Sequence, residues 1–295
     1  MTNPDPILTG RTRTFAVLGH PVAHSLSPAM HNPALRAMGM DAVYLAYDVA
    51  PEYLPDVLPA MSAMGFAGCN LTIPHKEIAF REIDRLADSA RLAGSVNTVV
   101  FFPDGEMEGH STDGYGLCTA LEEASGRGFS DAAVLILGCG GAGRAAAIQA
   151  VEEGASRLIL SNRTQVRAER LRTETQAHYP DRDISVAESW PPSPDLTSGV
   201  DLIIQSTSAG MEPGEPPLLQ HEHFSDRSFL LDMVYTQRET ATMREALAAG
   251  AGAANGLGML LHQGVKSLEI WTGQAPPVDV MRQALEQHIY AGEKS

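Results

Sequence analysis

The stretch AVLILGCGGAGRAA, residues 133–146, decides the fold of this chain. A short apolar run ends at a glycine-rich turn, and small residues follow, so the segment predicts a buried strand, a tight turn and a helix. The turn matches G-x-G-x-x-G through Gly138, Gly140 and Gly143. In this context the glycines let a pyrophosphate approach the unpaired N–H groups that begin the helix. The segment therefore predicts a dinucleotide-binding unit rather than a simple glycine-rich turn.

Strand and helix patterns alternate on both sides of this turn. Before it we expect strands at 15–19, 43–49, 69–73, 96–102 and 106–112, and helices at 27–38, 55–64 and 84–94. From Gly114 onward we expect strands at 133–138, 157–162, 184–188, 200–206 and 229–234, and helices at 114–125, 142–153, 256–273 and 278–292. Strands separated by helices predict parallel sheets of the doubly wound kind. The expected fold class is therefore α/β.

Length and composition place the chain among ordinary globular proteins. Its 295 residues suggest about two domains, and 44% of them are hydrophobic, enough for a sizeable core. The net charge of −15 argues against a nucleic-acid binder and against adhesion to an anionic membrane. Without a membrane-spanning run or a secretory signal, we expect a cytoplasmic protein. The cysteines at 69, 118 and 139 lack a metal-binding pattern, so we expect reduced thiols and no metal site.

A basic stretch follows the second strand of the dinucleotide-binding unit. An NAD-specific site would carry an acidic residue near this strand end for the ribose 2′-hydroxyl, but the chain has Asn162, Arg163 and Thr164 there. Five arginines and one glutamate lie between residues 157 and 172, a local charge of +4 in an acidic chain. Because arginine binds phosphate with two parallel hydrogen bonds and stays charged, the pattern predicts NADP(H) rather than NAD, with Arg163 and then Arg167 as contacts. Arg170 and Arg172 are better explained as a solvated helix face.

Lys76 is the strongest candidate for an acid or base. Lysine occurs only at positions 76, 266 and 294, so the chain normally uses arginine for positive charge. Lys76 follows the strand 69–73, at the carboxyl end where α/β sheets bind ligands. An ordinary lysine at a helix start is the alternative explanation. His75 is a rival base, although a packed loop histidine explains it better.

Other polar groups have simpler explanations when each is taken alone. Ser27 precedes a proline and could cap the helix that follows, and Asp113 could cap the next one. Ser25 and Asn97 could be turn and strand-end residues.

Nine motifs, in this order, resemble the shikimate dehydrogenase family over nearly the whole chain. They are HSLSPAMHN (24–32), NLTIPHK (70–76), GSVNTV (94–99), STDGYG (111–116), GCGGAGRAA (138–146), NRTQVRA (162–168), STSAGM (206–211), DMVYTQRET (232–240) and NGLGMLLHQG (255–264). The resemblance implies the reversible NADPH-dependent reduction of 3-dehydroshikimate to shikimate, a step toward chorismate and the aromatic amino acids. Members include monomers and dimers, so either a monomer or a homodimer is expected.

The resemblance also assigns residues to the substrate and to the chemistry. Lys76 is implied to be the catalytic acid/base, beside Asp113. Ser25 and Ser27 are implied to hold the substrate carboxylate, with Tyr235 near it. The groups implied to hydrogen-bond the ring hydroxyls are Thr72, Asn97, Asp113 and Gln263.

For the cofactor, the resemblance implies three regions. The pyrophosphate is expected at Gly138, Gly140, Gly141, Ala142 and Gly143, the 2′-phosphate at Asn162, Arg163, Thr164 and Arg167, and the nicotinamide near Gly256 and Met259. Residues 1–112 with 256–295 are expected to form the substrate-binding domain, and residues 113–255 a Rossmann-like NADP-binding domain inserted into it.

Three positions depart from the family pattern. Gln237 stands where proline is usual, QSTS (205–208) replaces NATS, and Pro33 interrupts the first helix.

One alternative function is a quinate/shikimate dehydrogenase that works oxidatively with NAD. Another is a non-catalytic NADP-binding regulator, which would be expected to lack Lys76 or Asp113; both are present.

Overall fold

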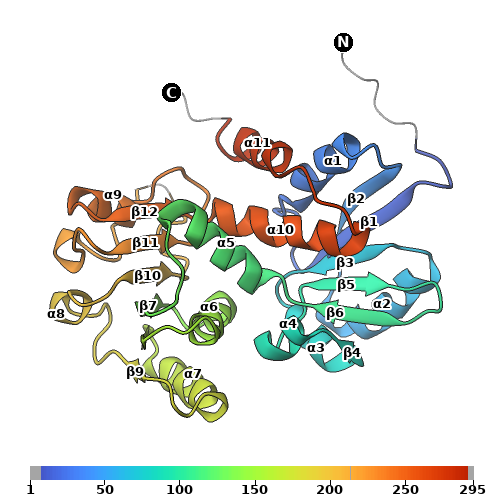
Figure 1. The fold of residues 1–295 in the computed structure, drawn as a ribbon. Helices are drawn as coiled ribbons and strands as arrows, with labels where there is room; N and C mark the ends of the chain where they lie inside the picture. Colours follow the sequence, from blue (N-terminus) through green and yellow to red (C-terminus); the bar gives the residue numbers. More distant parts are fainter. Residues whose placement is uncertain (1–7, 213, 292–295) are drawn as a thin grey trace. The chain divides into compact units, whose positions relative to one another are not determined.

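The chain builds two six-stranded β-sheets, and each belongs to its own unit. The computed structural model describes residues 8–212 and 214–291. One unit comprises Met1–Thr112 with Leu261–Ser295, and the other is the intervening Asp113–Leu260. Figure 1 shows the elements of both along the chain. The chain passes from the second unit back to the first between Leu260 and Leu261, inside a helix. The motif order predicts this boundary a few residues earlier, between 255 and 256.

The first unit contains a mixed sheet with the order β2-β1-β3-β5-β6-β4. Its strands are β1 (Arg13–Gly19), β2 (Ala42–Asp48), β3 (Gly68–Leu71), β4 (Arg85–Leu86), β5 (Thr98–Phe101) and β6 (Met107–His110). Its helices are α1 (Ser27–Ala37), α2 (Leu54–Ala63), α3 (Lys76–Glu82), α4 (Asp88–Ala93), the later part of α10 (Leu257–Thr272) and α11 (Val278–Ile289). β5 runs antiparallel to both β3 and β6, so the expected all-parallel arrangement holds only in part.

Alternate residues of β1 give this sheet two buried faces. Ala16 and Leu18 pack in one cluster with the apolar residues of α2, α3 and α4. Phe15 faces the other way and meets Trp271 of α10 with ring centroids 5.0 Å apart. Burial on both faces fixes the register of the strand, because a slip of one residue would exchange its faces.

The second unit is a parallel, doubly wound sheet with the order β12-β11-β10-β7-β8-β9. Its strands are β7 (Ala133–Leu137), β8 (Arg157–Ser161), β9 (Ile184–Val186), β10 (Leu202–Gln205), β11 (Phe229–Asp232) and β12 (Gly252–Asn255). Its helices are α5 (Asp113–Ser125), α6 (Gly141–Glu152), α7 (Gln165–His178), α8 (Pro194–Thr197), α9 (Ala241–Ala248) and the start of α10. The order reverses between β7 and β10, the place where such sheets bind nucleotides.

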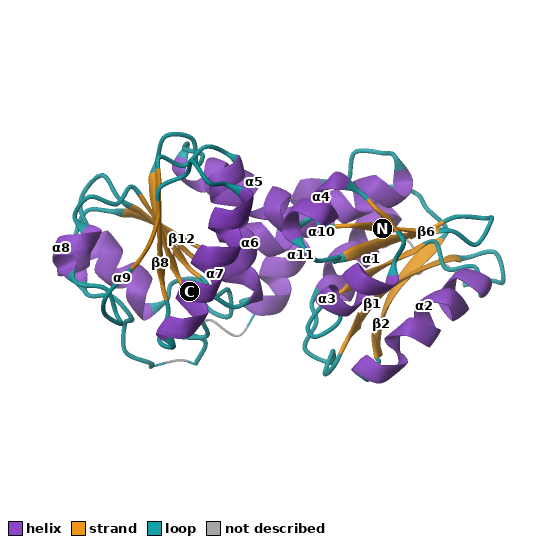
Figure 2. Cartoon of the chain, turned by 90° about the horizontal axis from the view of Figure 1, so that it is seen from below, coloured by secondary structure: helices purple, strands orange, loops and turns teal. Residues whose placement is uncertain are grey.

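Helices cover both faces of this second sheet (Figure 2). Val134 and Ile136 pack with α5, α6 and α7 in one cluster, whereas Leu135 and Leu137 pack in another with α9 residues such as Met243. A strand buried on both sides needs a continuous apolar run, which is what residues 133–137 provide. The predicted α/β fold class is therefore confirmed.

Three local expectations differ from the structure. Residues 84–94 do not form one helix, because Arg85 and Leu86 pair with β6 and only Asp88–Ala93 is helical. α9 and β12 have no counterpart among the elements that the sequence predicts. Pro33 lies inside α1, and the helix continues on both sides of it. Within the described residues, no helix is long and apolar enough to cross a membrane.

Candidate functional site

The glycine-rich turn after β7 has a geometry that side chains would prevent. Gly138 has φ of +95°, a conformation that favours glycine. A Cβ placed on Gly143 would lie 1.8 Å from the carbonyl oxygen of Gly138. The turn can therefore pack this closely against α6 only with glycine at these two positions.

The start of α6 is open toward a ligand. Gly140 precedes the helix and has no side chain, so no side-chain cap satisfies the first N–H groups. These donors and the positive end of the helix dipole suit an anion. The residues present therefore fit the pyrophosphate that the sequence predicts here.

Asn162 connects this turn to the loop after β8. Its Oδ1 accepts a hydrogen bond from the backbone N–H of Cys139 at 2.9 Å. Its Nδ2 donates to the carbonyl oxygen of Thr164, also at 2.9 Å. One side chain thus holds the glycine-rich turn and the arginine-bearing loop in a fixed relation.

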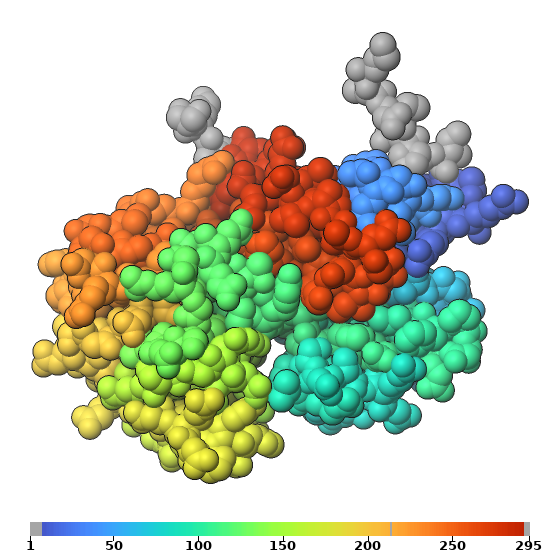
Figure 3. Space-filling view, viewed as in Figure 1, coloured from blue at the N-terminus to red at the C-terminus, as the bar shows by residue number. Residues whose placement is uncertain are grey.

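The five arginines between residues 157 and 172 divide into two groups. Arg157, Arg170 and Arg172 form ion pairs with Asp183, Glu174 and Glu169, at 3.9, 2.7 and 3.0 Å. Arg163 and Arg167 are exposed and form no ion pair within the part of the chain that the structure describes. Figure 3 shows the segment of α7 at the outer surface of its unit. The positive charge available to an anion is therefore that of Arg163 and Arg167.

A cavity of about 890 Å³ lies beside these groups, within the second unit. Its lining contains six of the predicted cofactor residues: Gly138, Gly140, Asn162, Arg163, Thr164 and Arg167. Sequence reasoning missed the rest of the lining, which comes mostly from loops: Trp190, Pro191, Ser206, Thr207, Ser208, Ala209, Glu215, Pro216, Pro217, Leu218, Gln220 and His223. The STSAG motif was the signal that could have indicated part of this lining.

The other predicted cofactor residues do not line the cavity. Gly141, Ala142 and Gly143 form the first turn of α6. Gly256 precedes α10, where a Cβ would lie 2.2 Å from the carbonyl oxygen of Met233. Met259 packs against the apolar cluster beneath α5 and α6. Gly256 thus has a packing reason to be glycine, independent of any ligand.

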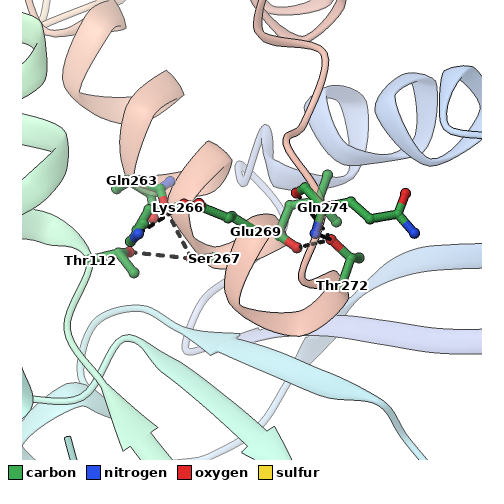
Figure 4. Close-up of polar contacts among 8 residues, drawn as sticks. Thr112, Gln263, Lys266, Ser267, Glu269, Thr272 and Gln274 are labelled. Carbon is green, nitrogen blue, oxygen red and sulfur yellow. Dashed lines mark hydrogen bonds and ion pairs between the residues drawn. The ribbon is translucent and has the colours of Figure 1, made fainter.

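In the first unit, the predicted substrate residue Asn97 lies in a buried polar network. Its Oδ1 accepts from the backbone N–H of Thr112 at 2.9 Å, and its Nδ2 donates to Thr112 Oγ1 at 3.0 Å. Ser267 of α10 lies 3.2 Å from Thr112 Oγ1 and donates to the carbonyl oxygen of Gln263 (Figure 4). The network therefore links Thr112, in the segment after β6, to Gln263 of α10.

Asn70 and Thr98 extend this network beneath β3 and β5. Asn70 Nδ2 donates to Thr98 Oγ1 at 3.1 Å and to Ser267 Oγ at 3.0 Å, and its Oδ1 accepts from the buried Tyr44 hydroxyl at 2.7 Å. Burial raises the pKa of Tyr44 well above its usual value. Every member is almost fully buried, so the network acts as a rigid support.

Thr72 and Lys76 both follow β3; the sequence predicts this for Lys76 but places Thr72 within the strand, which ends at Leu71. The backbone N–H of Thr72 donates to the carbonyl oxygen of Leu18 at 2.9 Å, and Lys76 is the first residue of α3, half-buried. The carbonyl oxygen of Lys76 accepts from the Val96 N–H at 3.0 Å, which joins α3 to the segment that carries Asn97. His75 is fully buried and its pKa is lowered by burial, which suits a packed loop histidine.

Ser25 and Ser27 lie where the loop after β1 enters α1. The Ser27 backbone N–H lies 3.4 Å from Ser25 Oγ, and the Ser27 carbonyl oxygen contacts His31 Nδ1 at 2.9 Å. Burial lowers the pKa of His31 to about 4, so the ring is neutral near pH 7. It stacks on Tyr44 with centroids 4.2 Å apart. These contacts fix the first turn of α1.

Asp113 and Tyr235 belong to the second unit. Asp113 is the first residue of α5, is largely buried, and directly follows Thr112 of the polar network. Tyr235 follows β11 and is half-buried, and burial raises its pKa. Asp113 thus begins a helix, and Tyr235 lies in the loop after β11.

The structure gives no sign of metal or disulfide chemistry in the residues it describes. They contain no cluster of three or more His, Cys, Asp or Glu that could hold a metal ion. All three cysteines are free, and burial raises the pKa of Cys139 to about 11 and that of Cys118 to about 12. These thiols are therefore protonated at neutral pH and poor nucleophiles.

Models of known families match segments on both sides of the glycine-rich turn. Residues 17–99 match the model of the shikimate dehydrogenase substrate-binding domain. Residues 256–286 match the model of the shikimate 5′-dehydrogenase C-terminal domain.

Similar proteins match the chain over nearly its whole length. A shikimate dehydrogenase (NADP⁺) of Methanopyrus kandleri is 39% identical over 280 residues, covering 94% of this chain and 96% of the relative. The structure of Thermus thermophilus shikimate 5-dehydrogenase with NADP(H) and shikimate has a TM-score of 0.81 at 36% identity, covering 93% and 99%. That of Listeria monocytogenes shikimate 5-dehydrogenase with shikimate and NAD has a TM-score of 0.87 at 35% identity, covering 94% and 98%.

Proposed function

Because the chain belongs to the shikimate dehydrogenase family, we propose that it catalyses the reversible NADPH-dependent reduction of 3-dehydroshikimate to shikimate. This is an oxidoreductase reaction on a CH–OH group, and it places the enzyme on the route to chorismate and the aromatic amino acids. The observation that carries the proposal is the cavity of the second unit, with its glycine-rich turn and its two arginines without carboxylate partners among the described residues.

The second unit holds the cofactor. Bound NADPH supplies a hydride to the C3 carbonyl of the substrate. The first N–H groups of α6 bind the pyrophosphate, and Gly138 and Gly143 allow the close approach. Asn162 keeps the turn and the loop 162–164 in the relation that this requires.

Preference for NADP(H) over NAD(H) comes from Arg163 and Arg167. Their guanidinium groups bind the 2′-phosphate, and Thr164 contributes its hydroxyl. The neighbouring arginines cannot take this role as readily, because Asp183, Glu174 and Glu169 already neutralise them. The ion pairs of the other three arginines therefore support Arg163 and Arg167 as the residues that bind the 2′-phosphate.

Most of the residues proposed to bind the substrate belong to the first unit. Ser25 and Ser27 hold its carboxylate, and Tyr235 of the second unit contributes to the same group. Thr72, Asn97, Asp113 and Gln263 bind its ring hydroxyls. The buried network of Asn70, Thr98, Thr112 and Ser267 supports the placement of Asn97 and Gln263, since each network member bonds to another.

Lys76 is the acid/base group of the reaction. In the reductive direction the Lys76 ammonium would donate a proton to the C3 oxygen of the substrate. In the oxidative direction the neutral amine accepts that proton back. Asp113 orients Lys76 and the reacting hydroxyl group. The proposed domains remain residues 1–112 with 256–295 for substrate and residues 113–255 for cofactor.

A four-way absorbance assay tests this proposal. Purified enzyme is given shikimate or quinate with NADP⁺ or NAD⁺, and reduced cofactor is followed optically. We expect the highest kcat/KM for shikimate with NADP⁺. Faster oxidation of quinate with NAD⁺ would instead support a quinate dehydrogenase. No oxidation with any pair would leave a cofactor-binding protein without this activity.

A further inference from the structure

The segment Ser206–Gly210, here called the cavity loop, forms one wall of the cofactor cavity and has no regular secondary structure. Ser206, Thr207, Ser208 and Ala209 line the cavity. The Ser206 hydroxyl contacts the carbonyl oxygens of Leu137 and Gly138, both at 2.9 Å, so the loop abuts the glycine-rich turn. The shape of this wall therefore depends on what holds the loop backbone.

Gln205 holds the first half of the cavity loop. It is the last residue of β10 and is fully buried. Its Oε1 accepts from the Thr207 backbone N–H, and its Nε2 donates to the Ala209 carbonyl oxygen at 2.9 Å. The same Nε2 lies 3.1 Å from Asp232 Oδ1, which fixes the amide in this orientation.

Gln237 holds the other end. Its Nε2 donates to the Gly210 carbonyl oxygen at 2.6 Å. The backbone carbonyl oxygen of Gln237 accepts a hydrogen bond from Asn255 Nδ2 at 3.1 Å, so the backbone at Gln237 is anchored to the end of β12. The Gly210 backbone N–H donates to Glu215, another residue of the cavity wall.

We infer that Gln205 and Gln237 are positioning residues that set the affinity for the dinucleotide by holding the cavity loop in its binding conformation. The inference rests on the proposed function of the cavity. An ordered loop lowers the entropic cost of binding, because the wall does not have to be ordered when the ligand arrives.

The position of the loop makes the inference specific. Arg163 and Arg167 follow β8, whereas the cavity loop follows β10. Loss of loop order should therefore weaken the binding of NADP⁺ and of NAD⁺ by the same factor, since the 2′-phosphate contacts stay in place. Loss of Arg163 or Arg167 should weaken the binding of NADP⁺ alone.

Calorimetric titration of the ligand-free enzyme with NADP⁺ and with NAD⁺ tests this difference. For Gln237→Ala we expect both Kd values to rise by about ten-fold, with their ratio unchanged. The KM for shikimate and the kcat at saturating cofactor should stay within about two-fold of wild type. Gln205→Ala should raise both Kd values in the same way. Gln205 is buried, so Gln205→Ala could fail to fold, and in that case the Kd values of Gln237→Ala alone test the inference.

Gln176→Ala is the matched control. The Gln176 Nε2 lies within hydrogen-bond distance of the carbonyl oxygens of Tyr179, Pro180 and Arg182 after α7, at 3.1, 2.9 and 3.0 Å, and Gln176 does not line the cavity. It should lower the melting temperature without changing either Kd.

Two results would overturn the inference: unchanged Kd values in Gln237→Ala, or a rise for NADP⁺ only. If the wild-type enzyme binds NADP⁺ and oxidises shikimate, the proposed function stands whichever result the variants give. If the wild type binds neither dinucleotide, the proposed function and the inference both fail.

Discussion

At the residue scale, proton transfer is assigned to Lys76. Replacement by methionine keeps most of the side-chain volume and removes the ammonium group, so we expect kcat to fall by about 10²- to 10⁴-fold. The KM for shikimate should change much less. Steady-state kinetics with the matched variant Lys266→Met checks this, because Lys266 pairs with Glu269 on α10 at 2.8 Å and has no proposed part in the reaction. A near-normal kcat with only a higher KM would reduce Lys76 to a binding residue.

The second prediction at this scale concerns Arg163. A hydrogen bond to a charged group contributes about 1.5–3 kcal/mol, so Arg163→Ala should raise the KM for NADPH by about 10- to 100-fold. The KM for NADH should barely change. Arg170→Ala is the control, because Arg170 already bonds to Glu174 and helps hold the pKa of that carboxyl below its usual range. Equal effects of Arg163→Ala on both cofactors would contradict the 2′-phosphate assignment.

Sequence reasoning could reach Arg163 but not the whole cavity wall. The glycines and the arginine follow strands whose apolar runs are visible in the sequence, so their positions could be predicted. Trp190 and the lining residues between 215 and 223 come mostly from loops, and only the folded chain brings them to the cavity. Likewise, the sequence shows five arginines, but which of them have carboxylate partners depends on tertiary structure.

At the element scale, the end of β11 carries a buried carboxyl that should make stability depend on pH. Burial raises the pKa of Asp232 to about 6, although Thr240 Oγ1, Val234 N–H and Gln205 Nε2 all donate to it. The folded pKa lies above the unfolded value of about 3.9. The protonated form therefore stabilises the fold below pH 4, and this contribution is lost as the pH rises through 6.

The variant Asp232→Asn should remove this pH dependence. The difference in unfolding free energy, wild type minus variant, should fall by about 2 kcal/mol between pH 4 and pH 7. Urea denaturation at several pH values measures it. A difference that stays constant or grows with pH would show that the Asp232 pKa is not raised.

Which elements could be predicted depended on how much each relies on its neighbours. β7 and α6 have strong local patterns, and they form close to the expected residues. β12 consists of Gly-Ala-Ala-Asn, which has no β-branched or aromatic residue, and it is a strand because it pairs with β11. The two-residue β4 is too short to show a period, and its pairing with β6 replaces the first turn of the expected helix.

At the scale of the whole molecule, the two units should respond to different ligands. Hydrogen exchange measures this directly, because bound ligand protects the amides that it orders. We expect NADP⁺ to protect residues around 138–145, 162–167 and 205–210, and shikimate to protect residues around 25–30, 70–78 and 96–98. Protection of the first set by shikimate alone would contradict the assignment of cofactor and substrate to separate units.

The insertion of one unit into the other could be predicted from motif order, because substrate motifs lie on both sides of the glycine-rich turn. The exact position at which the chain returns to the first unit could not be predicted in this way. The sequence places it before residue 256, whereas the structure divides the chain after Leu260. α10 runs without interruption from Leu257 to Thr272, so no break in the helix marks that division.

The stoichiometry of the reductive reaction tests the proposed activity most directly. Purified enzyme receives 3-dehydroshikimate and NADPH, and the NADPH consumed is compared with the shikimate formed, separated by chromatography. We expect one shikimate for each NADPH oxidised, at a rate well above that with NADH. Consumption of NADPH without formation of shikimate, or no reaction at all, would contradict the assignment.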